Sequence, residues 1–215
     1  MKAKMFFFIK RSIDIVLSII LIIFFSPIAL ITAIAIRLET PGPIFADTPP
    51  RVGKNGKPFR LYKFRSMIAN AHNLLRTDPK LAKLFEEYKK NSYKLVNDPR
   101  VTGVGKFIRK HSIDELPQLM NVLKGEMSIV GPRPYYPDEL EEQQKKYPNT
   151  KRYVQEVMDV KPGITGLWQT SGRSEINFDK RIEMDAQYAR KKSLMLDLMI
   201  MIKSPIVMIT GKGAA

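Results

Sequence analysis

The chain has no cysteine and, among its 215 residues, only two histidines, His72 and His111. It therefore forms no disulfide, no thiolate zinc site and no cysteine nucleophile, and it suits a reducing compartment such as the cytosol. Two histidines are also too few for a histidine-rich metal site. Any catalysis must use other groups, and carboxylate chemistry is the first kind to consider.

Negative charge is scarce: 21 acidic residues stand against 36 lysines and arginines, which gives a formal net charge of +15. This charge indicates an anionic partner, either nucleic acid, anionic lipid headgroups or phosphorylated substrates, and does not choose among them. Hydrophobic residues make up 44% of the chain, which is enough for a folded core. The length allows one domain of ordinary size together with a membrane segment.

Residues 15–36 contain no charged side chain, and this run of 22 residues is long enough for a membrane-crossing helix, which needs roughly 20. Ser26-Pro27 lies near its midpoint, where proline removes a backbone hydrogen bond and bends or breaks a helix. Lysine and arginine flank both ends, and both prefer the cytoplasmic side of the membrane. These features predict a re-entrant membrane anchor, helix-break-helix, over residues 1–38.

Two other interpretations of this segment remain open. It could be a cleaved signal peptide, because Ala33-Ile34-Ala35 has the small-residue spacing of a cleavage site, or it could be a buried core helix. The apolar run is longer than the usual hydrophobic region of a signal peptide, about 7–15 residues. A retained anchor is therefore the favoured interpretation.

Residues 39–215 are predicted to form one compact α+β domain that is mainly helical. The turn chemistry of Gly53–Lys57 predicts a strand from Phe59 to Phe64. Helical spacing occurs at 68–94, at 107–123 with an interruption at Pro117, and at 178–190.

The last apolar stretch, at about 194–210, carries Asp197 and Lys203, is broken by Ser204-Pro205 and follows three basic residues. This composition predicts an interfacial helix that lies in the membrane surface. A core helix of the domain is the alternative, because apolar helices are commonly buried.

The adjacent acids Asp114 and Glu115 are the central candidates for chemistry. A carboxylate can accept a phosphoryl group, and a neighbouring carboxylate can hold a divalent cation that neutralises the phosphate. Ser112 and Glu115 also have capping-box spacing, which is a purely structural alternative. Pro117 favours Asp114 as the cap, because proline is tolerated in a first helical turn and costly later. That register places both acids at a helix N-terminus, which attracts anions.

Two further segments could bind phosphate. Gly131-Pro132-Arg133-Pro134 holds one arginine between two prolines, so its guanidinium would lose little entropy on binding. A turn with an exposed arginine is the alternative. Residues 160–173 combine glycines with Trp168, the only tryptophan, and with Arg173, although a glycine-rich loop alone is a weak signal.

Three segments together resemble the bacterial sugar transferase family, the monotopic polyprenyl-phosphate phosphoglycosyl transferases. They are "YKFRSM" at 62–67, "DPRVTGVGKFIRKHSIDELPQLMNVLKGEMSIVGPRP" at 98–134 and "VKPGITGLWQTSGR" at 160–173. The resemblance covers nearly the whole chain, including the Ser-Pro pair in the anchor. It implies transfer of a sugar 1-phosphate from a UDP-sugar to undecaprenyl phosphate, with release of UMP, as the first membrane step of a surface glycan pathway.

The same resemblance implies roles for individual residues. Asp114 would attack the phosphate attached to the sugar and form a covalent phosphosugar intermediate, which the lipid phosphate then displaces. Glu115 would bind Mg²⁺. The side chains expected to line the pocket are Lys63, Arg109, Arg133, Arg173 and Asp185. For Asp185, a solvated acid on a basic helix is the alternative.

The resemblance also implies the partners and the location. UDP-sugar, undecaprenyl phosphate and membrane lipids are expected, without nucleic acid, at the cytoplasmic face of a bacterial inner membrane; a homodimer is left open. The chain looks like the minimal catalytic form, without the membrane bundle and extra domain of larger relatives. "KPGITGLWQTSGR" with "FDKRIEMDAQY" resembles the branch that handles hexose 1-phosphates, such as galactose or glucose, more than the acetamido-sugar branch.

Two other functions compete with this one. A membrane-tethered nucleic-acid-binding protein would interleave basic and aromatic residues along one face, whereas the aromatics here cluster in the anchor and in short motifs. A catalytically inactive scaffold of the same fold is disfavoured by the intact pair Asp114-Glu115 and by Arg133. Turnover of UDP-sugars distinguishes the sugar transferase, which predicts it, from the nucleic-acid-binding protein and the inactive scaffold, which do not.

Overall fold

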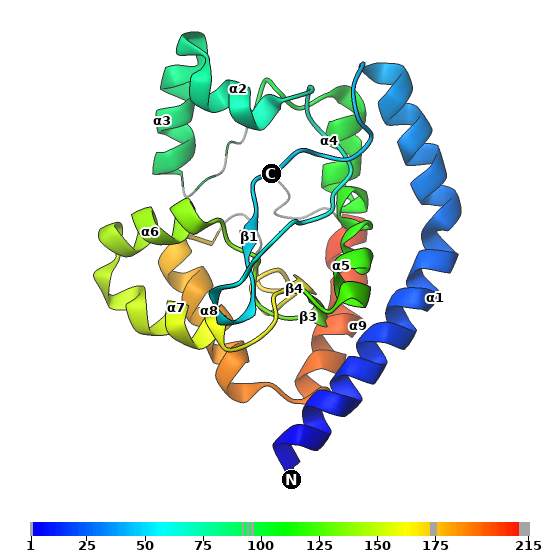
Figure 1. Cartoon of the computed structure of the whole chain (residues 1–215), viewed down its shortest axis with the longest axis vertical. Helices are drawn as coiled ribbons and strands as arrows, with labels where there is room; N and C mark the ends of the chain where they lie inside the picture. Colours follow the sequence, from blue (N-terminus) through cyan, green and yellow to red (C-terminus); the bar gives the residue numbers. More distant parts are fainter. Residues whose placement is uncertain (1, 92, 94, 96, 173–175, 211–215) are drawn as a thin grey trace.

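The computed structural model describes residues 2–91, 93, 95, 97–172 and 176–210. Helices make up most of this part of the chain, and its strands are only two or three residues long (Figure 1). The predicted mainly helical class is therefore confirmed. The α-helices of the described residues are α1 Lys2–Glu39, α2 Ala71–Thr77, α3 Ala82–Lys90, α4 Gly103–Lys110, α5 Gln118–Lys124, α6 Pro137–Lys146, α7 Lys151–Met158, α8 Phe178–Lys191 and α9 Leu194–Thr210.

The long helix α1 bends along one side of the domain (Figure 1). Pro27 lies inside it, and the Ser26 hydroxyl donates a hydrogen bond to the carbonyl of Ile23 at 2.8 Å. The predicted break at Ser26-Pro27 is therefore wrong: the helix continues through both residues.

The N-terminal half of α1 is attached to the domain by buried charges. Lys10 Nζ lies 2.6 Å from a carboxylate oxygen of Asp197 and also donates to the carbonyl of Val130 at 3.1 Å. One turn later, the Asp14 carboxylate accepts hydrogen bonds from the Ser128 hydroxyl and the Ile129 N–H, each 3.0 Å long. This end of α1 is thus fixed to residues 128–130 and to α9.

The C-terminal end of α1 is attached to the same domain. Arg65, which is buried, donates to the carbonyls of Thr40 and Pro41 at 2.8 Å and to that of Ile36 at 3.4 Å. Ile36 packs beside Phe64 and Ile108 in a small hydrophobic cluster. The apolar outer face between the two attachments is exposed, at Ile19, Ile20, Ile23, Phe24, Leu30 and Ile31. Among the described helices, α1 alone is long and apolar enough to cross a membrane.

Two small sheets connect the helices. β1 (Arg51–Val52) pairs antiparallel with β2 (Pro58–Phe59), and β3 (Ser128–Val130) pairs parallel with β4 (Gly163–Thr165). The strand predicted from Phe59 to Phe64 is therefore mostly wrong. Beyond Phe59 the backbone groups bond to other partners.

Asn121 of α5 supplies several of these partners. Its side chain accepts from the N–H of Tyr62 at 2.9 Å and donates to the carbonyl of Arg60 at 2.7 Å. The N–H of Phe64 donates to the carbonyl of Asp114 at 2.9 Å. Residues 60–64 are thus held against α5 and the turn before it, which brings Lys63 to the acidic pair.

The domain contains two main hydrophobic clusters. One gathers Leu119, Val122, Met127, Val130 and Ile200, and so joins α5, β3 and α9; the other gathers residues of α6, α7 and α8. The predicted helix at 178–190 is confirmed as α8, and the 68–94 region forms α2 and α3.

The helix α9 has one buried and one exposed apolar face. Ile200 and Asp197 are 2% and 4% exposed, whereas Met195, Leu198, Met199, Ile202 and Ile206 are all exposed. The helix also continues through Pro205, so the break predicted there is wrong. Because one face packs on the domain and the other stays apolar and exposed, α9 combines features of both predicted alternatives.

Candidate active site

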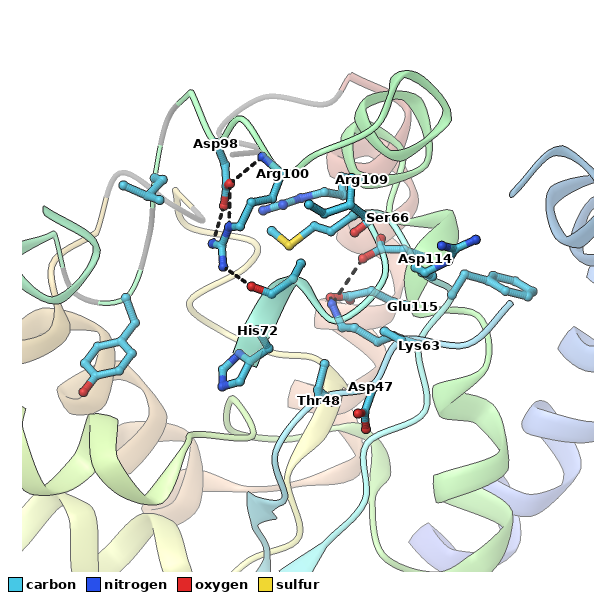
Figure 2. Close-up of a pocket in the computed structure, with 18 of the residues that line it drawn as sticks. Asp47, Thr48, Lys63, Ser66, His72, Asp98, Arg100, Arg109, Asp114 and Glu115 are labelled. Carbon is cyan, nitrogen blue, oxygen red and sulfur yellow. Dashed lines mark hydrogen bonds and ion pairs between the residues drawn. The ribbon is translucent and has the colours of Figure 1, made fainter. Parts of the chain in front are cut away.

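A polar cavity of about 270 Å³ lies between the segments 43–72 and 88–115, with Arg133 and Trp168 completing the wall (Figure 2). Basic side chains outnumber acidic ones along it. The basic residues are Arg51, Lys63, Arg65, Arg100, Arg109 and Arg133, and the acidic residues are Asp47, Asp98, Asp114 and Glu115. The cavity therefore suits an anionic ligand.

The acidic pair lies in a short 3-10 turn, Ile113–Glu115, between α4 and α5. Ser112 opens the turn with a left-handed backbone conformation, φ 56°, and makes no capping bond with its side chain. Pro117, and not Asp114, is the cap residue of α5. The predicted register is corrected accordingly: both acids precede the helix, and Pro117 stands where its missing N–H is not needed.

Lys63 contacts both acids. Its Nζ lies 2.8 Å from Glu115 Oε1 and 3.3 Å from Asp114 Oδ2 (Figure 2). Burial opposes the charge on Lys63, but the two carboxylates outweigh it and raise the pKa of the ammonium. Asp114 is only 6% exposed, and this burial raises the pKa of its carboxyl. The charge of Glu115 raises it further, whereas the charges of Lys63 and Arg109 lower it. The two cations therefore favour the ionised carboxylate that a nucleophile requires.

Arg133 lines the cavity, and its guanidinium carbon lies 5.3 Å from the centre of the Trp168 ring. Its backbone N–H donates to Asp185 Oδ2 at 3.1 Å, and the Tyr135 hydroxyl donates to the same oxygen at 2.8 Å. Asp185 is fully buried and is not part of the cavity wall. It therefore supports the Pro-Arg-Pro loop from behind. It does not line the pocket, contrary to what the sequence resemblance implied.

Of the other predicted residues, Arg109 lines the cavity near Asp114 (Figure 2). Arg173 lies outside the described residues. The structure thus brings together Lys63, Arg109, Arg133 and the two acids, and it places Asp185 beneath them.

Sequence reasoning missed several lining residues. Arg51 is buried with its guanidinium carbon 3.2 Å from the centre of the Tyr136 ring. Arg100 forms a buried ion pair with Asp98 at 2.6 Å. Asp98-Pro99-Arg100 lies inside one of the segments that carry the family resemblance. That position could have identified Arg100 as a lining residue. Arg51 had no such signal, because its position depends on a partner 85 residues away in the chain.

The described residues contain no group of three or more histidine, cysteine, aspartate or glutamate side chains placed to hold a metal. Mg²⁺ does not require one, because it is commonly bound by one or two carboxylates together with water and substrate phosphates. Asp114 and Glu115 offer that donor set at the cavity wall. The residues present therefore fit Mg²⁺ bound jointly with a phosphorylated substrate.

A second cavity, of about 590 Å³, is almost entirely apolar. It lies between α1, α5 and α9, and its walls include Leu17, Leu21, Phe25, Leu119 and Met201. Three residues line both cavities: Ser112, Glu115 and Gln169. The acidic pair thus lies where a polar compartment meets an apolar one.

Comparison with known sequences finds relatives over nearly the whole chain. A profile of the family described as "Bacterial sugar transferase" matches residues 5–211. Undecaprenyl-phosphate galactose phosphotransferase of Salmonella typhimurium is 43% identical over 214 residues, covering 96% of this chain and 42% of that protein. Exopolysaccharide production protein ExoY of Rhizobium meliloti is 38% identical over 209 residues, covering 95% of this chain and 87% of that protein.

A third relative, UDP-glucose:undecaprenyl-phosphate glucose-1-phosphate transferase of Escherichia coli, is 38% identical over 215 residues, which cover 96% of this chain and 41% of that protein. The chain thus spans about two fifths of the length of the Salmonella and Escherichia relatives and most of ExoY. Its long apolar helix suggests membrane attachment, and its polar cavity carries more basic than acidic side chains. The chain belongs to the bacterial sugar transferase family.

The buried acid behind the Pro-Arg-Pro loop makes stability depend on pH. Burial raises the pKa of Asp185 from 3.8 to about 7, so the folded protein holds this proton more tightly than the unfolded chain. The resulting stabilisation is complete below pH 4 and is lost as the pH rises through 7, a change on the order of 4 kcal/mol. We predict that Asp185→Asn removes this decrease.

Thermal unfolding in detergent between pH 4.5 and 8 checks the prediction, with the exposed Asp159→Asn as the matched control. Asp159→Asn should keep the wild-type pH profile. If the stability of the wild type and of Asp185→Asn fell equally with rising pH, Asp185 would not be the source of the pH dependence.

Proposed function

We propose that the chain transfers a sugar 1-phosphate from a UDP-sugar to undecaprenyl phosphate and releases UMP. The observation that carries this proposal is the acidic pair, buried Asp114 and partly exposed Glu115, which contacts Lys63 and lies where the polar and apolar cavities meet. A water-soluble anionic donor fits the polar cavity, and an isoprenoid chain fits the apolar one. The names of the Salmonella and Escherichia relatives describe transfer to undecaprenyl phosphate.

In the first step, an Asp114 carboxylate oxygen attacks the phosphorus that carries the sugar. A bond forms between that oxygen and phosphorus, the bond from phosphorus to the bridging oxygen breaks, and UMP leaves with the electron pair. Lys63 is placed to hold Asp114 ionised before attack and to stabilise charge on the phosphate oxygens afterwards. Arg109 and Arg133 supply further positive charge along the same wall.

In the second step, a phosphate oxygen of the lipid attacks the phosphorus held on Asp114. The new phosphorus–oxygen bond forms as the bond to Asp114 breaks, which restores the free carboxylate and gives the lipid-linked sugar diphosphate. The position of Glu115 in both cavity walls supports this second step. A lipid whose chain lies in the apolar cavity would bring its phosphate to the acidic pair from that side.

Mg²⁺ is the proposed cofactor, with Glu115 as its main protein ligand. When bound, it would neutralise charge on the donor phosphates. Glu115 remains 25% exposed along its side chain, so it can reach an ion that shares the cavity with substrate. The proposed donor carries a hexose, galactose or glucose, which are the sugars in the names of the Salmonella and Escherichia relatives.

The proposed topology is re-entrant, with the domain on the cytoplasmic face of a bacterial inner membrane. At about 1.5 Å per residue, α1 would be roughly 57 Å long if straight, well beyond the hydrocarbon thickness of about 30 Å. Lys10, Asp14 and Ile36, which lie toward the two ends of the helix, contact the same domain. A bend that dips the exposed middle into one leaflet satisfies both attachments, whereas a straight crossing would separate one of them from the domain.

Asp114→Asn tests the covalent mechanism. We expect UMP release to fall by about 10⁴-fold or more, because the nucleophile is lost, and we expect no phosphosugar to remain on the protein. The measurements are UMP release with undecaprenyl phosphate and a panel of UDP-sugars, and trapping of radiolabelled sugar phosphate on the denatured chain. Asp159→Asn should behave like the wild type; near-normal turnover of Asp114→Asn would refute the mechanism, and an inactive wild type would favour the scaffold alternative.

Glu115→Gln tests the metal assignment. Removing one charged oxygen ligand should raise the Mg²⁺ concentration for half-maximal UMP release by about tenfold or more, or abolish activity. The measurement is a Mg²⁺ titration of UMP release. The control is Glu183→Gln, at an exposed position on α8. An unchanged titration for Glu115→Gln would rule out this residue as the metal ligand.

The topology is tested by labelling. The chain has no cysteine, so one introduced at position 2 is a unique target. In sealed vesicles we expect a membrane-impermeant reagent to reach it from the same side as a cysteine introduced at the exposed position 159. Access from opposite sides would show that α1 crosses the membrane.

A further inference from the structure

Two polar atoms in the wall of the polar cavity have no role in the reaction described above. Thr48 Oγ1 and His72 Nε2 are each inaccessible to solvent, and neither has a hydrogen-bond partner within the described residues. Both residues line the cavity that contains the acidic pair. A buried polar atom without a partner costs free energy, so these two atoms are suited to a ligand that supplies the missing hydrogen bonds.

The two residues lie away from the acidic pair. In Figure 2, Thr48 and His72 are below Arg100 and to the left of Asp114 and Glu115. The two groups have different charged neighbours. The pKa of His72 is shifted by Arg76, Arg51, Asp138 and Arg100. The pKa of Asp114 is shifted by Lys63, Glu115 and Arg109. Arg51 is the charge that acts on both His72 and Lys63. The wall of one cavity thus includes the acids, Arg51, Thr48 and His72.

The imidazole of His72 is held in place and is uncharged. Its ring stacks on Tyr136 with centres 5.7 Å apart, and Arg51 covers Tyr136 at 3.2 Å. Burial, reinforced by Arg76 and Arg51, lowers the pKa of His72 to about 4. At neutral pH one ring nitrogen is therefore a hydrogen-bond acceptor, and Nε2 can take that role while a threonine hydroxyl can donate.

We infer that Thr48 and His72 bind the uracil ring of the donor nucleotide. The inference rests on the proposed function: once Asp114 faces the phosphate bearing the sugar, the nucleoside lies beyond the other phosphate, toward Arg51 and His72. Uracil presents an N–H donor at N3 between two carbonyl acceptors, O2 and O4. His72 Nε2 accepts from N3–H and the Thr48 hydroxyl donates to a neighbouring carbonyl, so each unpartnered atom gains one hydrogen bond. Tyr88 and Tyr93, whose ring centres lie 5.1 Å apart, belong to the same cavity wall.

The experiment compares two ligands on the full-length chain in detergent, UMP and UMP methylated at N3. Methylation removes the donor that His72 is inferred to accept, so the wild type should bind the methylated ligand about tenfold or more weakly, the loss of one buried hydrogen bond. In His72→Leu the two ligands should bind with equal affinity. Isothermal titration calorimetry measures both, and because each comparison is made within one protein, a general loss of folding does not imitate the result.

Steady-state kinetics give a second readout. His72→Leu and Thr48→Val should each raise KM for the UDP-sugar about tenfold with little change in kcat, because uracil binding is uniform between ground and transition states. The matched controls are Asn73→Ala and Thr77→Val on exposed positions of α2, which should leave KM unchanged.

An N3-methyl penalty that is the same in the wild type and in His72→Leu, or equal binding of both ligands by the wild type, would overturn the inference. Either result leaves the proposed function standing as long as the wild type releases UMP from a UDP-sugar. Failure of the wild type to release UMP from any UDP-sugar would overturn the proposed function itself. The two failures are therefore distinguishable.

Discussion

Two carboxylates occupy one short turn at the cavity wall, and a single ammonium lies against both. Burial and the charge of Glu115 raise the pKa of Asp114, so a nearby positive charge is needed to oppose that shift. Lys63 supplies the compensation, and its position depends on residues 60–64 docking on Asn121 and on the carbonyl of Asp114. The chemistry of the cavity therefore depends on a contact between an extended segment and α5.

A second contact connects the membrane helix to the cavity. Asp14 and Lys10 of α1 hold the backbone of β3, and β3 leads directly into the loop that presents Arg133. Asp185 holds that loop from the opposite side. The N-terminal half of α1 and the Pro-Arg-Pro loop are thus connected through β3, so under the proposed membrane attachment the insertion of α1 would set the height of the cavity relative to the lipid. That geometry suits a reaction between a soluble donor and a membrane-bound acceptor.

Local patterns predicted part of the fold and site. The charge-free segment 15–36, the acids Asp114-Glu115 and the rigid Pro-Arg-Pro loop were recognisable because each is continuous in the sequence, and α8 followed from its helical spacing. The strand predicted from Phe59 to Phe64 was mostly wrong because the N–H groups of Tyr62 and Phe64 donate to a side chain and a turn about 50–60 residues away, while Phe64 forms only an isolated antiparallel bridge with Phe45. The supporting role of Asp185 was invisible for the same reason.

The sequence by itself determined that this chain carries a long apolar segment and a large excess of positive charge, and that it has no cysteine chemistry, because composition sets these properties without reference to folding. Only the tertiary structure decided that α1 bends without breaking and that Lys63 contacts both acids. It also decided that Glu115 belongs to two cavities, and that Thr48 and His72 line the polar one. Burial and hydrogen-bond partners arise between segments distant in sequence, and no local pattern records them.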